Sequence, residues 1–186
     1  MISFLKRQLY KINSRFLGLK KIGRGSCIIK PLKVERPNTI VIGCKVTIHD
    51  FGWIMGGTDS SNVTLSIDDG ATIGHFSHII ALSQVVIEKN VLLADKVFIS
   101  DCTHNYEQIN SPIISQGVSI FKPVLIGEGS WLGENVCVCG ASIGKHCVVG
   151  ANSVVIEDIP DYSVAVGSPA KVVKKYDFEK EQWVKV

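Results

Sequence analysis

The stretch from Ile126 to Val155 reads IGEGSWLGENVCVCGASIGKHCVVGANSVV, and it decides the fold. An aliphatic residue opens each of six short steps, namely Ile126, Leu132, Val138, Ile143, Val149 and Val155. Each step is six residues long except the one that begins at Val138, which is five. Glycine follows the aliphatic residue in four steps, and the fifth place usually holds a small residue such as Ser130 or Ser153. A six-residue period matches neither an amphipathic helix nor an ordinary half-buried strand, and it is typical of a hexapeptide-repeat β-helix.

The same period begins earlier in the chain, where it is less regular. Ile67, Ile73 and Ile79 are six residues apart, and after a slip of two residues Ile87, Leu93 and Ile99 continue the series. We expect three steps to close one triangular coil, with the aliphatic residues inside and with glycine or a short polar residue turning the corners, where a positive φ costs glycine least. The coils should stack about 4.8 Å apart. A β-sandwich would show a period of two and hairpin turns, so the predicted fold class is all-β, a parallel β-helix.

Composition agrees with one compact domain. The chain has 186 residues, of which 46% are hydrophobic and only 8% aromatic, so the core should consist of aliphatic side chains. It has six cysteines but no C-x-x-C pair, and neither a secretory signal nor an apolar run of transmembrane length is visible. These features predict reduced thiols in a cytoplasmic protein.

The two ends of the chain differ from the repeat region. Residues 1–21 carry six basic residues, no acidic residue and apolar residues at helical spacing. We expect a short basic amphipathic helix that caps the open end of the prism, with contact to the inner membrane surface as a second role. Nucleic acid is not an expected partner, because no aromatic-interleaved basic face continues beyond this segment. The repeat domain is predicted to span residues 22–175, followed by a C-terminal extension over 176–186 that packs on the prism through Phe178 and Trp183.

One interruption of the period indicates where the chemistry lies. Between Ile99 and Val124 the chain reads SDCTHNYEQINSPIISQGVSIFKP, which predicts a loop inserted at about residues 101–122. Long excursions from a repeat usually serve binding or catalysis. His104 lies at the start of this loop, with Asp101 and Glu107 near enough in sequence to orient its imidazole. The remaining histidines are interpreted as solvent-facing or hydrogen-bonded residues: His49, His75, His78 and His146.

Four features together resemble the hexapeptide-repeat acetyltransferases. They are DCTH at 101–104, PVLIGEGSWLGENV at 123–136, the glycine ladder, and IPDYSVAVGSPAKVVK at 159–174. Within that family the pattern is most similar to the maltose and galactoside O-acetyltransferases and to enzymes that O-acetylate lipopolysaccharide and capsular sugars. The resemblance covers residues 65–175 and implies a left-handed parallel β-helix, a homotrimer and acetyl-CoA as the donor. It also implies active sites shared between neighbouring subunits, and no metal.

The resemblance also implies roles for individual residues. His104 corresponds to the general base, which removes a proton from the acceptor hydroxyl. Asp101, Asn105 and Glu107 are candidates for orienting this base or contacting the acceptor. The candidate donor-binding residues fall into three groups: Trp131, Glu134 and Ala151 along the pantetheine arm, Gly140 and Ala141 in a short turn beside it, and Lys171 and Lys174 near the nucleotide phosphates. Glu157 departs from the family pattern, because a basic residue often stands at this position.

The predicted activity is acetyl transfer from acetyl-CoA to a sugar hydroxyl. Residues 1–64 lack the acceptor-binding segment expected of a maltose or galactoside enzyme, which favours a polysaccharide, a lipid-linked oligosaccharide or a sugar precursor as the acceptor. Four alternatives remain at this point. They are N-acetylation of an amino sugar, double displacement through Cys102, a non-catalytic trimeric scaffold, and a zinc enzyme resembling the γ-type carbonic anhydrases. The zinc alternative requires three histidines across an interface, and the spacing of His75 and His78 does not match it.

Overall fold

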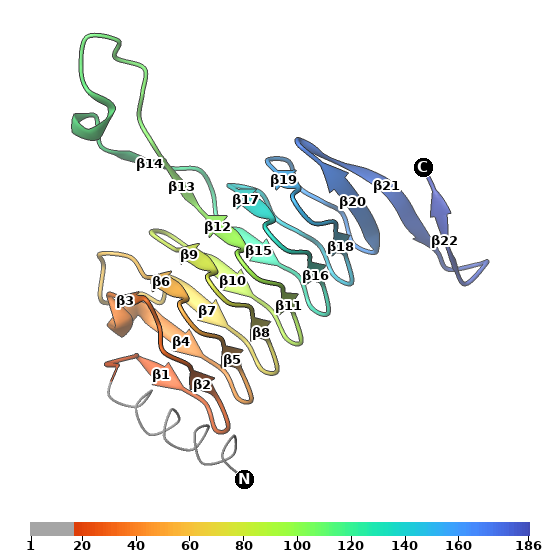
Figure 1. Ribbon diagram of the computed structural model, residues 1–186, viewed down its shortest axis with the longest axis horizontal. Helices are drawn as coiled ribbons and strands as arrows, with labels where there is room; N and C mark the ends of the chain where they lie inside the picture. Colours follow the sequence, from red (N-terminus) through yellow and green to blue (C-terminus); the bar gives the residue numbers. More distant parts are fainter. Residues whose placement is uncertain (1–16) are drawn as a thin grey trace.

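The computed structural model describes residues 17–186 (Figure 1). The predicted helical cap over residues 1–21 lies outside the described residues up to residue 16. Residues 17–20 have no regular secondary structure, and the first strand begins at Lys21. Within the described range no helix has the length and hydrophobicity that a membrane crossing requires.

Three long sheets wind around a common core in the described part of the chain (Figure 1). The first sheet contains β1 (Lys21–Ile22), β4 (Ile40–Ile42), β7 (Leu65–Ile67), β10 (Val85–Ile87) and β15 (Val124–Ile126). The second contains β2 (Cys27–Ile28), β5 (Thr47–Ile48), β8 (Thr72–Ile73), β11 (Leu92–Leu93), β16 (Trp131–Leu132), β18 (Val148–Val149), β20 (Ser163–Gly167), β21 (Ala170–Asp177) and β22 (Gln182–Lys185). The third contains β3 (Lys33–Glu35), β6 (Trp53–Met55), β9 (His78–Ile80), β12 (Phe98–Ser100), β17 (Cys137–Cys139) and β19 (Val154–Val155).

The register of these sheets confirms the six-residue period. Ile87 pairs with Ile67 on one side and Ile126 on the other, and all three strands are parallel. Leu93 lies between Ile73 and Leu132 in the same way, so the predicted aliphatic residues form columns inside the prism. These side chains are at most 1% exposed. The five-residue step has a visible consequence, because Ile143 forms only isolated bridges to Ile126 and Ile159 instead of a strand.

Glycine or a short polar residue turns the corners, as predicted, but the glycines that directly follow the aliphatic residues have a different role. Gly133 does not have a positive φ; that conformation occurs two residues later, at Asn135, where φ is 61°. A Cβ atom on Gly133 would lie 2.7 Å from the backbone nitrogen of Ala151 in the next coil. On Gly127 it would lie 2.5 Å from the carbonyl carbon of Gly144. Glycine is therefore required here for close stacking of the coils, and asparagine, which tolerates the left-handed region, turns this corner.

Antiparallel strands complete the C-terminal end. β20 pairs with β21, and β21 pairs with β22, so the last residues form strands added to the second sheet. Trp183 lies with its ring centroid 5.4 Å from that of Tyr176, and Phe178 lies 4.9 Å from Tyr162. These contacts place the two predicted anchors, Phe178 and Trp183, in one aromatic cluster at the end of the prism.

Candidate active site

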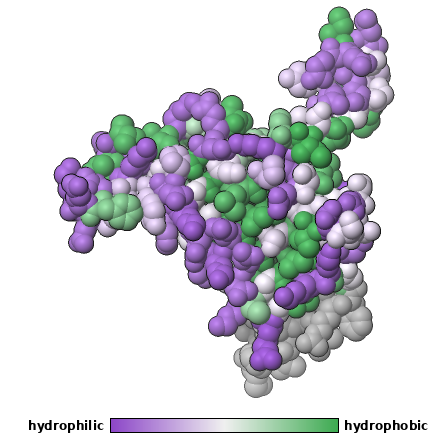
Figure 2. Space-filling view, turned by 180° about the vertical axis from the view of Figure 1, so that it is seen from behind, coloured by the Kyte–Doolittle hydropathy of each residue, from purple (hydrophilic) through white to green (hydrophobic). Residues whose placement is uncertain are grey.

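The inserted loop forms an arm that projects from the coils. β13 (Cys102–His104) pairs antiparallel with β14 (Val118–Ile120), and a 3-10 turn at Ile113–Ser115 lies near the tip. The other 3-10 turn of the described residues, at Pro37–Thr39, belongs to the coils and not to the arm. Figure 1 shows the arm extending away from β12, and Figure 2 shows it from behind with hydrophobic and hydrophilic residues mixed on its surface. The loop is held by its own polar side chains, since Gln116 binds the backbone of Gln108 in both directions, at 2.9 and 3.0 Å.

A buried carboxylate fixes the root of the arm. Asp101 is fully buried and accepts hydrogen bonds from the backbone N–H groups of Leu82, Ser83 and Gln84, at 2.6 to 2.9 Å. Its backbone carbonyl also accepts a hydrogen bond from the N–H of Phe121. Both carboxylate oxygens are committed to the preceding coil. The expectation that Asp101 orients His104 therefore has no contact to support it, and the residue instead ties the arm to the stack.

His104 ends β13 and is exposed. Its imidazole has no hydrogen bond or ion pair among residues 17–186. The two other candidates for orienting it are engaged elsewhere. Asn105 binds the backbone carbonyl of Gln116 at 3.0 Å and accepts the hydroxyl of Ser119, and Glu107 accepts the N–H of Tyr106. The ring of His104 is thus open to a substrate or to another chain.

Cys102, two residues away, is a poor nucleophile. Burial raises the pKa of its thiol, and the hydrogen bond with the hydroxyl of Ser100 lowers it by less. The thiol is therefore protonated near neutral pH, whereas attack on a thioester requires the thiolate. This environment disfavours double displacement.

The candidate donor-binding residues of the coils lie on the second sheet and at its edge. Trp131 pairs with Val148, Val148 with Val164, and Val164 with Lys174, so they form one row across four strands. Trp131 is 48% exposed, which indicates that this row faces outward. At the adjoining corner, Asn152 donates its N–H to the carbonyl of Glu134. Ala151 is therefore stacked directly against the coil of Glu134.

A bulge places both predicted lysines on this face. Lys171 pairs with Val166 and Lys174 with Val164, although residues three apart in a regular strand point to opposite sides. The register shift between Val164 and Ala165 supplies the extra residue in β21. Lys171 is not free, since its ammonium lies 2.9 Å from the carboxylate of Glu157. Lys174 has no ion pair within the described residues.

The remaining candidates are less accessible or already paired. Ala141 is fully buried in the core, so only its backbone can meet a ligand. Gly140, with φ of 60°, lies beneath Phe121, and a Cβ there would come within 2.6 Å of that side chain. Glu134 forms an exposed ion pair with Lys96 at 3.0 Å.

Two groupings escaped prediction from spacing along the chain. One is the ion pair of Glu157 with Lys171. The other is a cluster of His49, Asp50 and His75 at a corner of the coils. The signal for the second was present in the sequence. Once Ile48 and Ile73 are aligned as successive core positions, Asp50 and His75 fall at the same place in adjacent coils.

Comparison with known proteins agrees with this geometry. Residues 123–157 match the family described as the hexapeptide repeat of succinyl-transferase. A putative lipopolysaccharide biosynthesis O-acetyl transferase of Escherichia coli, WbbJ, is 40% identical over 124 residues, which is 63% of each chain. A probable acetyltransferase of Mycobacterium tuberculosis is 43% identical over 112 residues, 60% of this chain and 37% of that protein. The matches thus span less than two thirds of these relatives.

Solved structures share the architecture. AntD, an N-acyltransferase from Bacillus cereus solved with dTDP and 3-hydroxybutyryl-CoA, has a TM-score of 0.77 over 91% of this chain and 90% of its own, at 18% identity. A maltose O-acetyltransferase from Clostridium difficile has a TM-score of 0.50 and 27% identity over 82% of this chain and 70% of its own. The likeness to AntD concerns the fold and confirms a left-handed parallel β-helix of hexapeptide repeats. The repeat region of the chain is therefore similar in sequence to hexapeptide-repeat acetyltransferases, and the chain shares their fold.

Proposed function

We propose that this protein is an acetyl-CoA-dependent O-acetyltransferase that acts on a sugar hydroxyl, with His104 as the general base. The observation that carries the proposal is an exposed imidazole without a partner among residues 17–186, held at the start of an arm that leaves the coils. Its relative from Escherichia coli is named as an O-acetyl transferase of lipopolysaccharide biosynthesis, which supports a sugar hydroxyl as the acceptor.

The chemistry needs one base and one activated thioester. The His104 imidazole removes the proton of the acceptor hydroxyl while that oxygen attacks the acetyl carbonyl, and CoA leaves as the thiol. A histidine suits this step because its ordinary pKa of about 6.5 leaves much of it neutral at physiological pH. Cys102 takes no part, since burial keeps its thiol protonated.

The donor is proposed to lie along the outward face of the second sheet. Trp131 and the Glu134–Ala151 corner would line the pantetheine arm, and Lys174 would supply positive charge to the phosphates. Lys171 would contribute less, because Glu157 neutralises it at 2.9 Å. Of the two lysines, Lys174 is therefore the stronger candidate for phosphate binding.

We propose a homotrimer in which the arm of one chain meets the donor face of another. In Figure 1 the arm and the β21–β22 strands leave the coils on opposite sides, which supports a site completed by a second chain. The arm also exposes hydrophobic residues that a neighbour can cover. Ile114 is 82% exposed, and Ile109 is 93% exposed. Such residues are typical of an interaction surface.

The first test is calorimetric titration of the purified protein with acetyl-CoA and CoA, together with its mass in solution. We expect saturable binding by a trimer at one site per chain, and weaker binding after Lys174→Ala. Lys33→Ala serves as the matched control, because Lys33 is an exposed lysine on β3 at the other end of the stack. A well-folded protein that binds neither ligand would contradict the proposal.

The second test identifies the acceptor by measuring CoA release with a panel of sugars, including amino sugars and oligosaccharides. Release that depends on a free hydroxyl supports O-acetylation. Release only with an amino sugar would replace it with N-acetylation, which is the acyl chemistry named for AntD.

A further inference from the structure

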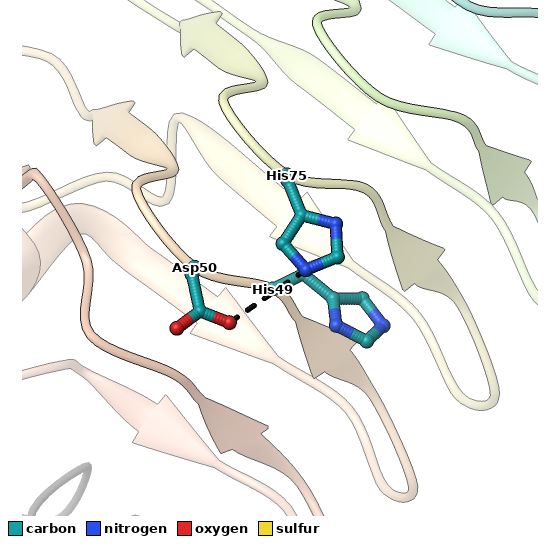
Figure 3. Close-up of side chains that lie close together, drawn as sticks. All are labelled: His49, Asp50 and His75. Carbon is teal, nitrogen blue, oxygen red and sulfur yellow. Dashed lines mark ion pairs between the residues drawn. The ribbon is translucent and has the colours of Figure 1, made fainter.

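A cluster of metal-ligating side chains lies outside the proposed active site, at a corner of the N-terminal coils (Figure 3). His49 and Asp50 follow β5, and His75 follows β8 in the next coil. One ligand atom from each of the three residues can be chosen so that all lie within 4.8 Å of one another. All three residues are half-buried. In Figure 3 the carboxylate of Asp50 and the ring of His75 point toward each other, with His49 beside them.

The distances suit a small ion. Nε2 of His75 lies 3.7 Å from Oδ2 of Asp50. Two atoms bound to one zinc ion at about 2.1 Å in tetrahedral geometry are about 3.4 Å apart, so a small side-chain rotation completes the pair. The rings of His49 and His75 are 4.7 Å apart between centroids, which places a second imidazole at the same corner.

Asp95 fixes the orientation of the His75 ring from the following coil. Its Oδ1 lies 3.1 Å from Nδ1 of His75 and also accepts the backbone N–H of His75 at 2.8 Å. A carboxylate bound to Nδ1 holds the proton on that nitrogen and leaves Nε2 as the lone-pair donor facing Asp50. Metal-bound histidines almost always have such a partner on their second nitrogen.

We propose that His49, Asp50 and His75 bind one divalent transition-metal ion, with Asp95 as the positioning residue. Two imidazole nitrogens and one carboxylate oxygen favour zinc or a similar ion over magnesium or calcium, which prefer oxygen ligands alone. Three protein ligands leave one tetrahedral position for water. Because the ligands come from two adjacent coils, the ion clamps those coils together. The inference is independent of the proposed transferase activity.

The test is titration with zinc chloride of the full chain, freed of metal with a chelator and carrying no polyhistidine tag. We expect one ion per chain, with binding abolished by His49→Ala and by His75→Ala. Asp95→Asn should weaken affinity by about 10- to 100-fold, as is usual when the partner of a ligating histidine is changed. His146→Ala is the matched control, because His146 is an exposed corner histidine stacked on Tyr162, away from the cluster. It should leave affinity unchanged.

Two further readouts separate this site from the thiols and from a folding defect. Cobalt binding should give the visible d–d absorption of a tetrahedral site, without the intense near-ultraviolet band of a cysteine ligand. Zinc should raise the melting temperature of the wild type and of His146→Ala, but not of the folded His49→Ala variant. Equal zinc affinity in the wild type and His75→Ala, a sulfur band with cobalt, or no binding at millimolar zinc would each overturn the proposal. In those cases the His75 imidazole bridges the carboxylates of Asp50 and Asp95 and binds no metal ion.

Discussion

Hydrophobic side chains are buried in the stacked coils but exposed in the projecting arm. In the coils, Ile99 and Leu132 are fully buried, and inner strands such as β12 are hydrogen-bonded to neighbouring coils on both sides. In the arm, Ile109 and Ile114 are almost fully exposed, and β13 pairs only with β14. The coils account for their own stability, whereas the arm shows apolar surface that its own chain does not cover.

This difference separates the residues that stabilise the fold from those that are proposed to take part in catalysis. Asp101 lies where the arm joins the coils, and its carboxylate stabilises this junction by accepting three backbone hydrogen bonds. His104, three residues further on, has left the coils and is exposed. Substitutions in the two regions should therefore affect different measurable properties.

The largest expected effect is in the arm. His104→Ala should lower the rate of acetyl transfer by about 100- to 10,000-fold, the usual contribution of a general base. Stability, mass in solution and CoA affinity should stay at wild-type values, because the side chain has no hydrogen bond or ion pair to lose within the described residues. CoA release with the acceptor found in the screen measures the rate. Asn110→Ala, an exposed residue of the same arm, is the control, and a His104→Ala variant of near wild-type rate would remove His104 from the mechanism.

The converse experiment compares a substitution in the core with a substitution in the arm. Leu132→Ala should lower the free energy of unfolding by about 2 to 5 kcal/mol, because it leaves a cavity among fully buried side chains. Ile114→Ala should lower it by less, because Ile114 is 82% exposed within its own chain and loses only the contacts that a neighbouring subunit makes. Both are measured by denaturant unfolding at one protein concentration. Similar losses in the two variants would show that the arm stabilises the chain as the core does.

A smaller effect distinguishes a thiol of the coils from one at the arm root. The hydrogen bond between the Cys137 and Cys139 thiols lowers the pKa of Cys137 to about 7, whereas burial raises the pKa of Cys102. Only the thiolate reacts with alkylating agents, so alkylation of Cys137 should rise with pH and reach half its maximum near pH 7. Cys102 should react only at higher pH. Mass spectrometry of protein alkylated at several pH values checks both.

Cys139→Ala is the control for this thiol pair. It removes the hydrogen-bond partner of Cys137, so the midpoint for Cys137 should move toward the ordinary cysteine value of about 8.5. An unchanged midpoint would mean that Cys139 does not stabilise the thiolate.

The smallest expected effect concerns the donor face. Glu157→Gln should free Lys171 from its ion pair and tighten CoA binding a few-fold, in keeping with the roughly 0.2 to 1 kcal/mol of an exposed pair. Glu35→Gln makes the same charge change in a partly exposed pair with Lys33 near the start of the stack, and it should leave CoA binding unchanged. Calorimetry measures both. Equal affinities in the two variants would remove Lys171 from the donor site.

The fold was predictable from the sequence because the period is carried by residues that share one environment. Ile67, Ile87 and Ile126 can be aligned by counting, and the structure stacks them in that order. The reason for the glycines was not predictable by counting along one strand. Gly133 is required by the approach of the Ala151 backbone in the next coil, which becomes visible only when coils are superposed.

The site was predictable only in part, for the same reason. Loss of the period marked the arm and His104, but the antiparallel register of the hairpin and the engagement of Asp101 depend on contacts far apart in sequence. The sequence spacing of Lys171 and Lys174 does not reveal the bulge that turns both side chains to one face of the sheet. His49 and His75 likewise meet only across coils.

The most direct test of the account is subunit mixing, because the arm of one chain is claimed to act at the donor face of another. His104→Ala and Lys174→Ala chains are unfolded together, refolded as mixed trimers and assayed at low acetyl-CoA. If the site lies between chains, random mixing should rebuild about a quarter of the wild-type sites, and the activity of the mixture should exceed the average of its two parents. If the mixture shows only the average of its two parents, each site belongs to one chain and the claim is contradicted.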